Sequence, residues 1–192
     1  MSKKMELQKF VQNYLSELGQ LLPRLDVDAI TTAIEWLRNA AAEGRTIYSC
    51  GNGGSASIAS HMVVEFVKVA SVGRNPRFKM IGLTDSISTI TACANDSNYD
   101  EIFSEPLKNF AAPGDVLIAI SGSGNSRNVL QAVETANALG CKTMGLTTAN
   151  SGRLREIVQL PLLVPSTHMG RLEDCFLAVS HVLCYAFIEK VL

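Results

Sequence analysis

Two residues four apart, His61 and Glu65, are the pair in this sequence best suited to chemistry. Within a helix this spacing places both side chains on one face, close enough to bind one metal ion or one substrate together. Imidazole and carboxylate are ligands that zinc accepts, and both groups can move protons near neutral pH. Such a pair is more often a solvated ion pair, but its neighbours argue against a solvated face because they are apolar: Met62, Val63, Val64 and Phe66.

A second histidine, His181, lies in an apolar helix pattern and would by itself be interpreted as a core residue. Beside His61 and Glu65 it becomes a further candidate for the same site, as does Glu173, because both are of the right type for zinc. Eight helical residues span about 12 Å. Glu173 and His181 can therefore share an ion only if Glu173 lies on an irregular helix start, or if two chains contribute.

The elements that must position His61 and Glu65 begin with a β-prone run over 46–50, the loop Gly51-Asn52-Gly53-Gly54-Ser55 and a helix pattern over 56–68. A strand, a glycine-rich turn and a helix N-terminus together form an anion site. Many α/β proteins have such turns without any ligand. The loop also matches the dinucleotide pattern G-x-G-x-x-A, but no acidic residue stands about 20 positions further on, so we discount a nicotinamide site.

A second loop of the same kind, Ser121-Gly122-Ser123-Gly124-Asn125-Ser126, follows the fully apolar run 116–120. The hydroxyls of Ser121, Ser123 and Ser126 can donate hydrogen bonds to phosphate oxygens, together with the backbone N–H groups of the loop. The alternative is a flexible linker, which would not follow a buried strand so closely. Two such loops at the carboxyl ends of parallel strands predict a phosphate-binding site at a topological switch point.

The remaining patterns alternate strands with helices, which predicts an α/β fold with a parallel sheet covered on both faces. Further strands are expected at 78–83, 116–120, 143–146 and 160–164, and further helices at 85–94, 102–110, 128–139, 154–158 and 172–191. Two helices, 5–22 and 28–43, precede this core. Asp28 is a candidate N-cap of the second helix and Gly44 its stop.

Composition limits the classes of function. The chain has 192 residues, 47% of them hydrophobic, and a net charge of −1, which gives no electrostatic case for nucleic acid as a partner. The chain has no run of about 18 apolar residues, so the sequence predicts no membrane span. The first ten residues also lack the apolar core of a signal peptide. Five scattered cysteines suggest reduced thiols and a cytoplasmic location.

Four stretches in combination resemble the sugar isomerase (SIS) superfamily, and within it the phosphoheptose isomerase family. They are G-N-G-G-S-A followed by H-x-x-x-E, A-N-D at 94–96, S-G-S-G-N-S at 121–126, and R-L-E-D followed by a histidine at 171–181. The similarity covers nearly the whole chain. It implies a flavodoxin-like three-layer fold in which a five-stranded parallel sheet carries an N-terminal helical extension.

The resemblance further implies one SIS domain over 1–192, with N-terminal helices at 1–44 and an α/β core at 45–192, assembled as a homotetramer with active sites at subunit contacts. It implies one zinc ion per subunit, with Glu65 as base and His181 as acid. The zinc ligands it implies are His61, Glu65, Glu173 and His181. The substrate contacts it implies are Asn52, Gly53, Gly54, Ser55, Asn95, Asp96, Ser121, Gly122, Ser123, Ser126 and Glu173.

Two positions depart from the family pattern. The family usually has glutamine where this chain has Glu173, and S-T-S-G where this chain has Ser121-Gly122-Ser123-Gly124. A carboxylate adds negative charge to the metal site, which favours retention of a cation and changes the contact with the sugar. These departures bear on the identity of the sugar more than on the class of reaction.

The implied reaction interconverts an aldose and a ketose phosphate through an enediol, with sedoheptulose 7-phosphate and D-glycero-D-manno-heptose 7-phosphate as the expected pair. Two alternatives stay open. One is isomerisation of a different sugar phosphate. The other is a non-catalytic SIS module that binds a phosphosugar or a protein, which the presence of both Glu65 and His181 argues against.

Overall fold

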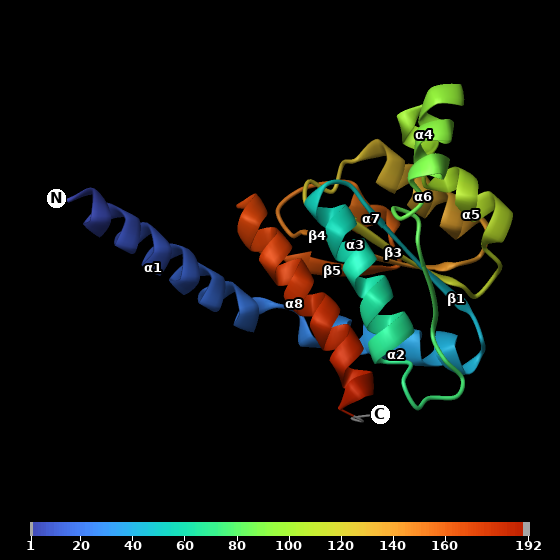
Figure 1. The fold of residues 1–192 in the computed structure, drawn as a ribbon, viewed down its shortest axis with the longest axis horizontal. Coiled ribbons are helices and arrows are strands. Elements are labelled where there is room, and N and C mark those ends of the chain that lie inside the picture. Colours follow the sequence, from blue (N-terminus) through green and yellow to red (C-terminus); the bar gives the residue numbers. More distant parts are fainter. Residues whose placement is uncertain (1, 190–192) are drawn as a thin grey trace.

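The computed structural model describes residues 2–189. They form a five-stranded parallel sheet with helices on both faces (Figure 1). The strands are β1 (Thr46–Gly51), β2 (Lys79–Gly82), β3 (Val116–Ser121), β4 (Lys142–Thr148) and β5 (Leu160–Val164), in the spatial order β2-β1-β3-β4-β5. This is the flavodoxin-like strand order. The α/β fold class and the parallel sheet predicted from the sequence are confirmed.

Two buried clusters lie on opposite faces of the sheet. Along β3, Val116, Ile118 and Ile120 join one cluster, and Leu117 and Ala119 join the other, as the two-residue period of a strand requires. The first cluster includes residues of helices α2 (Val27–Ala42), α3 (Gly54–Val64) and α8 (Met169–Ile188). The second includes residues of α5 (Ser104–Phe110), α6 (Arg127–Ala138) and α7 (Leu154–Ile157), and α4 (Ile87–Asp96) packs against it. Both faces are therefore covered, and the three-layer architecture is confirmed.

The N-terminal helix α1 (Lys3–Leu21) extends away from the body of the molecule (Figure 1). Its second half contacts α8, where the Tyr14 hydroxyl donates a 2.6 Å hydrogen bond to Asp174. A 3₁₀ turn, η1 (Leu22–Arg24), then leads into α2. The expected N-terminal helical extension is present, and most residues of α1 are exposed.

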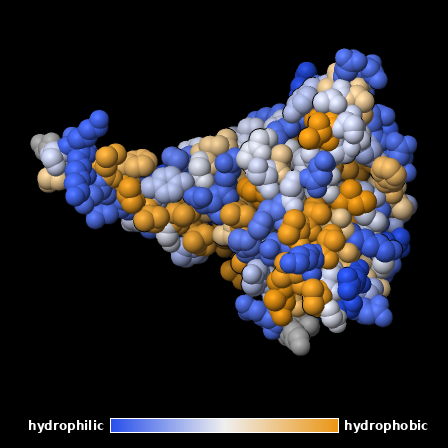
Figure 2. Space-filling model, in the orientation of Figure 1, coloured by the Kyte–Doolittle hydropathy of each residue, from blue (hydrophilic) through white to orange (hydrophobic). Residues whose placement is uncertain are grey.

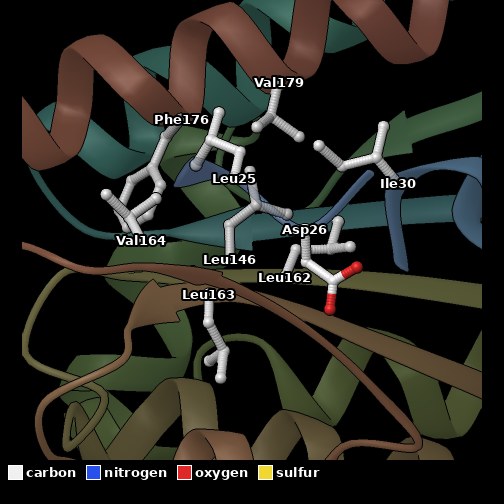
Figure 3. A pocket seen from close by; sticks show the side chains of 9 residues that line it. All are labelled: Leu25, Asp26, Ile30, Leu146, Leu162, Leu163, Val164, Phe176 and Val179. Atoms are coloured by element: carbon white, nitrogen blue, oxygen red, sulfur yellow. The ribbon is translucent and has the colours of Figure 1, made fainter. Parts of the chain in front are cut away.

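The N-cap of α2 is Asp26, and the sequence-based choice of Asp28 was wrong. The Asp26 carboxylate accepts a 2.9 Å hydrogen bond from the backbone N–H of Ala29. Leu25, just before the helix, and Ile30 within it both pack against the sheet and α8 (Figure 3), and α2 begins two residues earlier than Asp28 would place it. Asp28 is left inside the first turn.

Three helix boundaries differ from the sequence pattern in ways that affect the site. Helix α3 begins at Gly54 and ends in a π-helical turn, η2 (Glu65–Val69), with Glu65 as its first residue. Helix α4 runs to Asp96, so Asn95 and Asp96 lie on its last turn. Helix α8 begins at Met169, and Glu173 therefore lies within regular helix; the expected end of this helix at 191 lies outside the described residues. No helix in the described part of the chain is long and apolar enough to span a membrane.

Candidate active site

The glycine loop and the serine loop are neighbours at one edge of the sheet. Strands β1 and β3 are adjacent and parallel, with Gly51 opposite Ile120, so both loops leave from the carboxyl ends of adjoining strands. Here the strand order reverses direction, which makes this edge the switch point where α/β proteins bind ligands. Gly53, just before α3, has φ +55°, a conformation that favours glycine.

Three hydroxyls of the serine loop converge. Ser121 Oγ lies 3.2 Å from Ser126 Oγ and 3.5 Å from Ser123 Oγ. Ser121 and Ser123 each accept a bond from a backbone N–H of the loop, which leaves their own hydrogens free to donate. Ser126 stands at the N-terminus of α6 without capping a backbone N–H. The loop can thus supply several donors to one anion at a helix N-terminus.

A cavity opens between the two loops and the start of α8. Of the predicted substrate contacts, it brings together Asn52, Ser55, Ser121, Gly122, Ser123, Ser126 and Glu173; Ile120 and Met169 also line it. Gly54 lies against the Glu173 carboxylate so closely that a Cβ there would clash with Oε1. None of these lining residues is a lysine or arginine, so an anion bound here would rely on neutral donors.

The candidate catalytic residues form a second group, between α3 and α8. His61 Nε2 lies 2.9 Å from His181 Nε2, with the two rings nearly perpendicular, and 4.0 Å from Glu65 Oε1. The Glu65 side chain is only 13% exposed. Its Oε2 is buried without a hydrogen-bond partner among the described residues. A buried carboxylate oxygen without a donor is free to accept a proton or bind a cation.

The two groups do not merge within one chain. Glu173 lines the serine-loop cavity, whereas His181 lies eight residues further along the same regular helix, about 12 Å away. Asn95 and Asp96 are exposed on α4, with Asn95 bonded to Asp96, and neither is among the residues lining the cavity. The predicted roles of all these residues stay predictions.

Comparison with known proteins identifies the family. The family model described as SIS domain matches residues 13–148. The chain belongs to the SIS domain family. Its curated relatives include phosphoheptose isomerases from Chlorobaculum tepidum, 35% identical over 181 residues, and Geotalea daltonii, 37% identical over 181 residues. These alignments cover 93% and 90% of this chain and 86% and 88% of the relatives.

Solved structures agree with the SIS assignment. Phosphoheptose isomerase GmhA from Neisseria gonorrhoeae superposes with a TM-score of 0.87 at 28% identity, covering 95% of this chain and 99% of that one. A phosphoheptose isomerase from Francisella tularensis gives a TM-score of 0.83 at 28% identity, covering 99% and 100%. The resemblance drawn from the sequence motifs is confirmed. These relatives support the expected enzyme class, an aldose–ketose isomerase.

The donor types in the SIS site suit a metal ion, although one chain does not complete a site. Two imidazole nitrogens bound to one tetrahedral zinc lie about 3.3 Å apart, since each Zn–N bond is about 2.0–2.1 Å. The facing nitrogens of His61 and His181 are near that spacing, and the unpartnered Glu65 oxygen supplies a third donor. Within residues 2–189, however, no group of three or more His, Cys, Asp or Glu side chains already has the arrangement of a metal site.

Two residues near the site were not predicted from the sequence. Met169 packs on the serine loop, where a Cβ at Gly122 would be 2.5 Å from its Sδ. Cys184 is fully buried one helical turn beyond His181. Burial, followed by the charge of the nearby Glu65 carboxylate, raises the pKa of Cys184 to about 12. Helical spacing could have predicted that both lie near the site, because residues three or four apart share a helix face. Met169 lies four residues before Glu173, and Cys184 lies three residues after His181.

We expect Cys93 alone to react when the folded protein is treated with iodoacetamide at pH 8. Burial raises the pKa of Cys50 to about 12 and that of Cys141 to about 11, and it also raises that of Cys175. The reactive thiolate is therefore nearly absent at the four buried cysteines. Peptide mass spectrometry should show one labelled site in buffer and five in 8 M urea. Rapid labelling of Cys184 in buffer would contradict the complete burial of its side chain.

Proposed function

We propose that this SIS protein is an aldose–ketose isomerase that converts sedoheptulose 7-phosphate into D-glycero-D-manno-heptose 7-phosphate. The observation that carries the proposal is the group formed by Glu65, with its unpartnered buried oxygen, and the facing His61 and His181. A binding module needs neither a base nor an acid, whereas an isomerase needs both. The convergent hydroxyls of the serine loop supply the phosphate anchor.

In the proposed mechanism Glu65 removes a proton from the carbon next to the ketose carbonyl. The electron pair of that C–H bond forms the carbon–carbon double bond of an enediol, and His181 provides the proton that the carbonyl oxygen takes up. Glu65 then returns its proton to the former carbonyl carbon, and the neighbouring hydroxyl loses its proton to His181. Atoms balance, and neither group is consumed. Glu65 suits the role of base because its buried Oε2 has no hydrogen-bond partner among the described residues.

Zinc is part of the proposal. His61, Glu65 and His181 would hold it, with Glu173 as the fourth ligand, and a bound zinc ion would polarise the carbonyl oxygen of the sugar. Because Glu173 lines the serine-loop cavity of its own chain, it can reach the same ion only from a neighbouring chain. That neighbour would bring its serine loop with it. The full active site would then lie at a subunit contact.

Exposed apolar surface supports the proposed homotetramer. Along α1, which projects from the body, apolar side chains are about half exposed or more: Met5, Leu7, Phe10, Val11 and Leu15. A second apolar surface lies over α3, η2 and α8 and includes Val64, Val67, Val182 and Tyr185. Figure 2 shows apolar residues gathered along α1 and on the lower part of the body. Surfaces of this kind mark protein contacts.

The experiment that tests the function is an isomerisation assay with a panel of ketose and aldose phosphates, together with metal analysis of the purified protein. We expect turnover of sedoheptulose 7-phosphate to exceed that of pentose and hexose phosphates. A preference for another sugar phosphate would favour the first alternative, in which Glu173 and Gly122 change the sugar. Binding without turnover of any of them would favour the binding module. The cytoplasmic location and the single-domain extent over 1–192 belong to the same proposal.

We expect light scattering at micromolar concentration to show four chains per particle. Val11 and Leu15 lie one helical turn apart on α1 and are 51% and 62% exposed. Replacing both by glutamate places two charges in the apolar stripe and should release smaller species while leaving the circular dichroism spectrum unchanged. A monomer in the unaltered protein would refute the tetramer, and with it the active site shared between chains.

A further inference from the structure

The side-chain amides of Asn52 and Asn128 join the glycine loop to the helix that follows the serine loop. Asn52 Nδ2 donates to Asn128 Oδ1 at 2.9 Å, and Asn128 Nδ2 donates to Asn52 Oδ1 at 2.9 Å. Asn128 lies in the first turn of α6 and is only 2% exposed. The residues are 76 positions apart in sequence, so this reciprocal pair is a tertiary connection between the two loops.

One backbone group fixes the direction of both amides. The N–H of Val129 points at Asn128 at a distance of 2.9 Å. A backbone N–H can only donate, so the atom it meets must be the oxygen of Asn128. The nitrogen of Asn128 then faces Asn52 and must meet an oxygen there. The hydrogen bond from Val129 N–H to Asn128 therefore fixes the orientation of the Asn52 amide as well, although Asn52 takes no part in that bond.

Tyr99 adds a second donor to Asn52. Its hydroxyl lies 3.0 Å from Asn52 Oδ1 and donates to it. Tyr99 belongs to η3 (Tyr99–Glu101), the 3₁₀ turn after α4, which also faces α6 through an exposed ion pair between Asp100 and Arg127 at 3.5 Å. The oxygen of Asn52 thus accepts two hydrogen bonds, which uses both of its lone pairs.

We propose that Asn128 and Tyr99 are positioning residues that make Asn52 a pure hydrogen-bond donor toward the ligand. Of the two hydrogens on Asn52 Nδ2, one goes to Asn128 and one is left, and Asn52 lines the same cavity as the serine loop. The ligand group placed there must then be an oxygen acceptor, such as a phosphate oxygen or a sugar oxygen lone pair. A group that offers only donors, such as the ammonium of an amino sugar, is excluded. This inference rests on the proposed phosphosugar function and deepens it.

The test uses Asn128→Leu, which keeps the size of the side chain, and Tyr99→Phe, which removes only an exposed hydroxyl. Each variant loses hydrogen bonds to Asn52, so we expect KM for the phosphosugar to rise about tenfold and about threefold respectively, with kcat within about twofold. In an Asn52→Ala background neither change should raise KM further, because both act through Asn52. Asn109→Leu is the matched control, since Asn109 is exposed on α5 and its side chain donates to the nearby carbonyl of Glu105, away from the two loops.

A second measurement separates failure of this inference from failure of the proposed function. The side-chain ¹⁵N signal of Asn52, identified as the one lost in Asn52→Ala, should move in Tyr99→Phe and in Asn128→Leu but not in Asn109→Leu. This holds whether or not any sugar phosphate is turned over. An unmoved Asn52 signal in both variants would overturn the inference. The inference would also be overturned if Asn128→Leu and Tyr99→Phe raised KM in the Asn52→Ala background by as much as they do in the wild-type protein.

Discussion

Glu65→Gln is expected to lower kcat of isomerisation by about 10²–10⁴-fold, the range that general acid–base groups contribute. Glutamine keeps the size of glutamate but cannot accept a proton, so the fold should be retained while the proton transfer is lost. The carboxylate is well placed for this role because its Oε2 is buried and unpartnered among the described residues, one helical turn from the His61–His181 contact. Steady-state kinetics with thermal unfolding as the control for folding would measure the effect.

Metal content separates two reasons for that loss. If Glu65 acts mainly as a ligand, the variant will lose zinc and added zinc will restore part of the activity. If it acts mainly as the base, zinc will stay and activity will not return. His181→Gln should lower kcat by a similar factor, and Lys68→Gln, at an exposed position on η2 outside the proposed contact surface, serves as the control for a new amide near Glu65. If folded Glu65→Gln turned over substrate at nearly the wild-type rate, Glu65 could not be the base.

The elements of the fold were predictable because their signals are local. A fully apolar run such as 116–120 indicates a buried strand, and a following turn of glycine and serine indicates the loop. The start of α8 was placed three residues late for an equally local reason. Its N-cap is His168, whose Nδ1 accepts a 3.4 Å bond from the N–H of Arg171, and histidine is not among the residues that usually mark a helix N-terminus.

The partners of the site residues were not predictable, because they depend on how distant segments pack. His61 meets His181 across 120 positions, and Asn52 meets Asn128 across 76. A helical period shows that His61 and Glu65 share a face, but it does not show which turn of α8 that face contacts. Helices α3 and α8 lie side by side (Figure 1), and their contact brings His181 to His61 while leaving Glu173 beside Gly54.

This separation makes the serine loop the second decisive test. Replacing Ser123 and Ser126 together by alanine removes two hydroxyls that converge with that of Ser121. Each lost hydrogen bond to a charged group is worth about 1.5–3 kcal/mol, so KM for a phosphosugar should rise about 10²–10⁴-fold. The change should fall on KM more than on kcat, since phosphate binding is shared by the ground state and the transition state. Ser57→Ala, at an exposed serine on α3, is the control. An unchanged KM in the double variant would show that the serine loop does not bind the phosphate.

Mixing the two impaired variants, assayed at a substrate concentration near the wild-type KM, then shows which chains build each site. If Glu65 of one chain works with the serine loop of its neighbour, tetramers reassembled from equal amounts of Glu65→Gln and the Ser123→Ala, Ser126→Ala variant contain some sites with both halves intact. Random assembly would leave about one quarter of the sites complete, so about a quarter of wild-type activity should return. If each chain supplied both halves of its own site, every site would carry one defect and the activity of the mixture would stay at the mean of the two variants. We expect recovery, because Glu173 lies in the serine-loop cavity, about 12 Å along α8 from His181, and could complete the proposed zinc site only in a neighbouring chain.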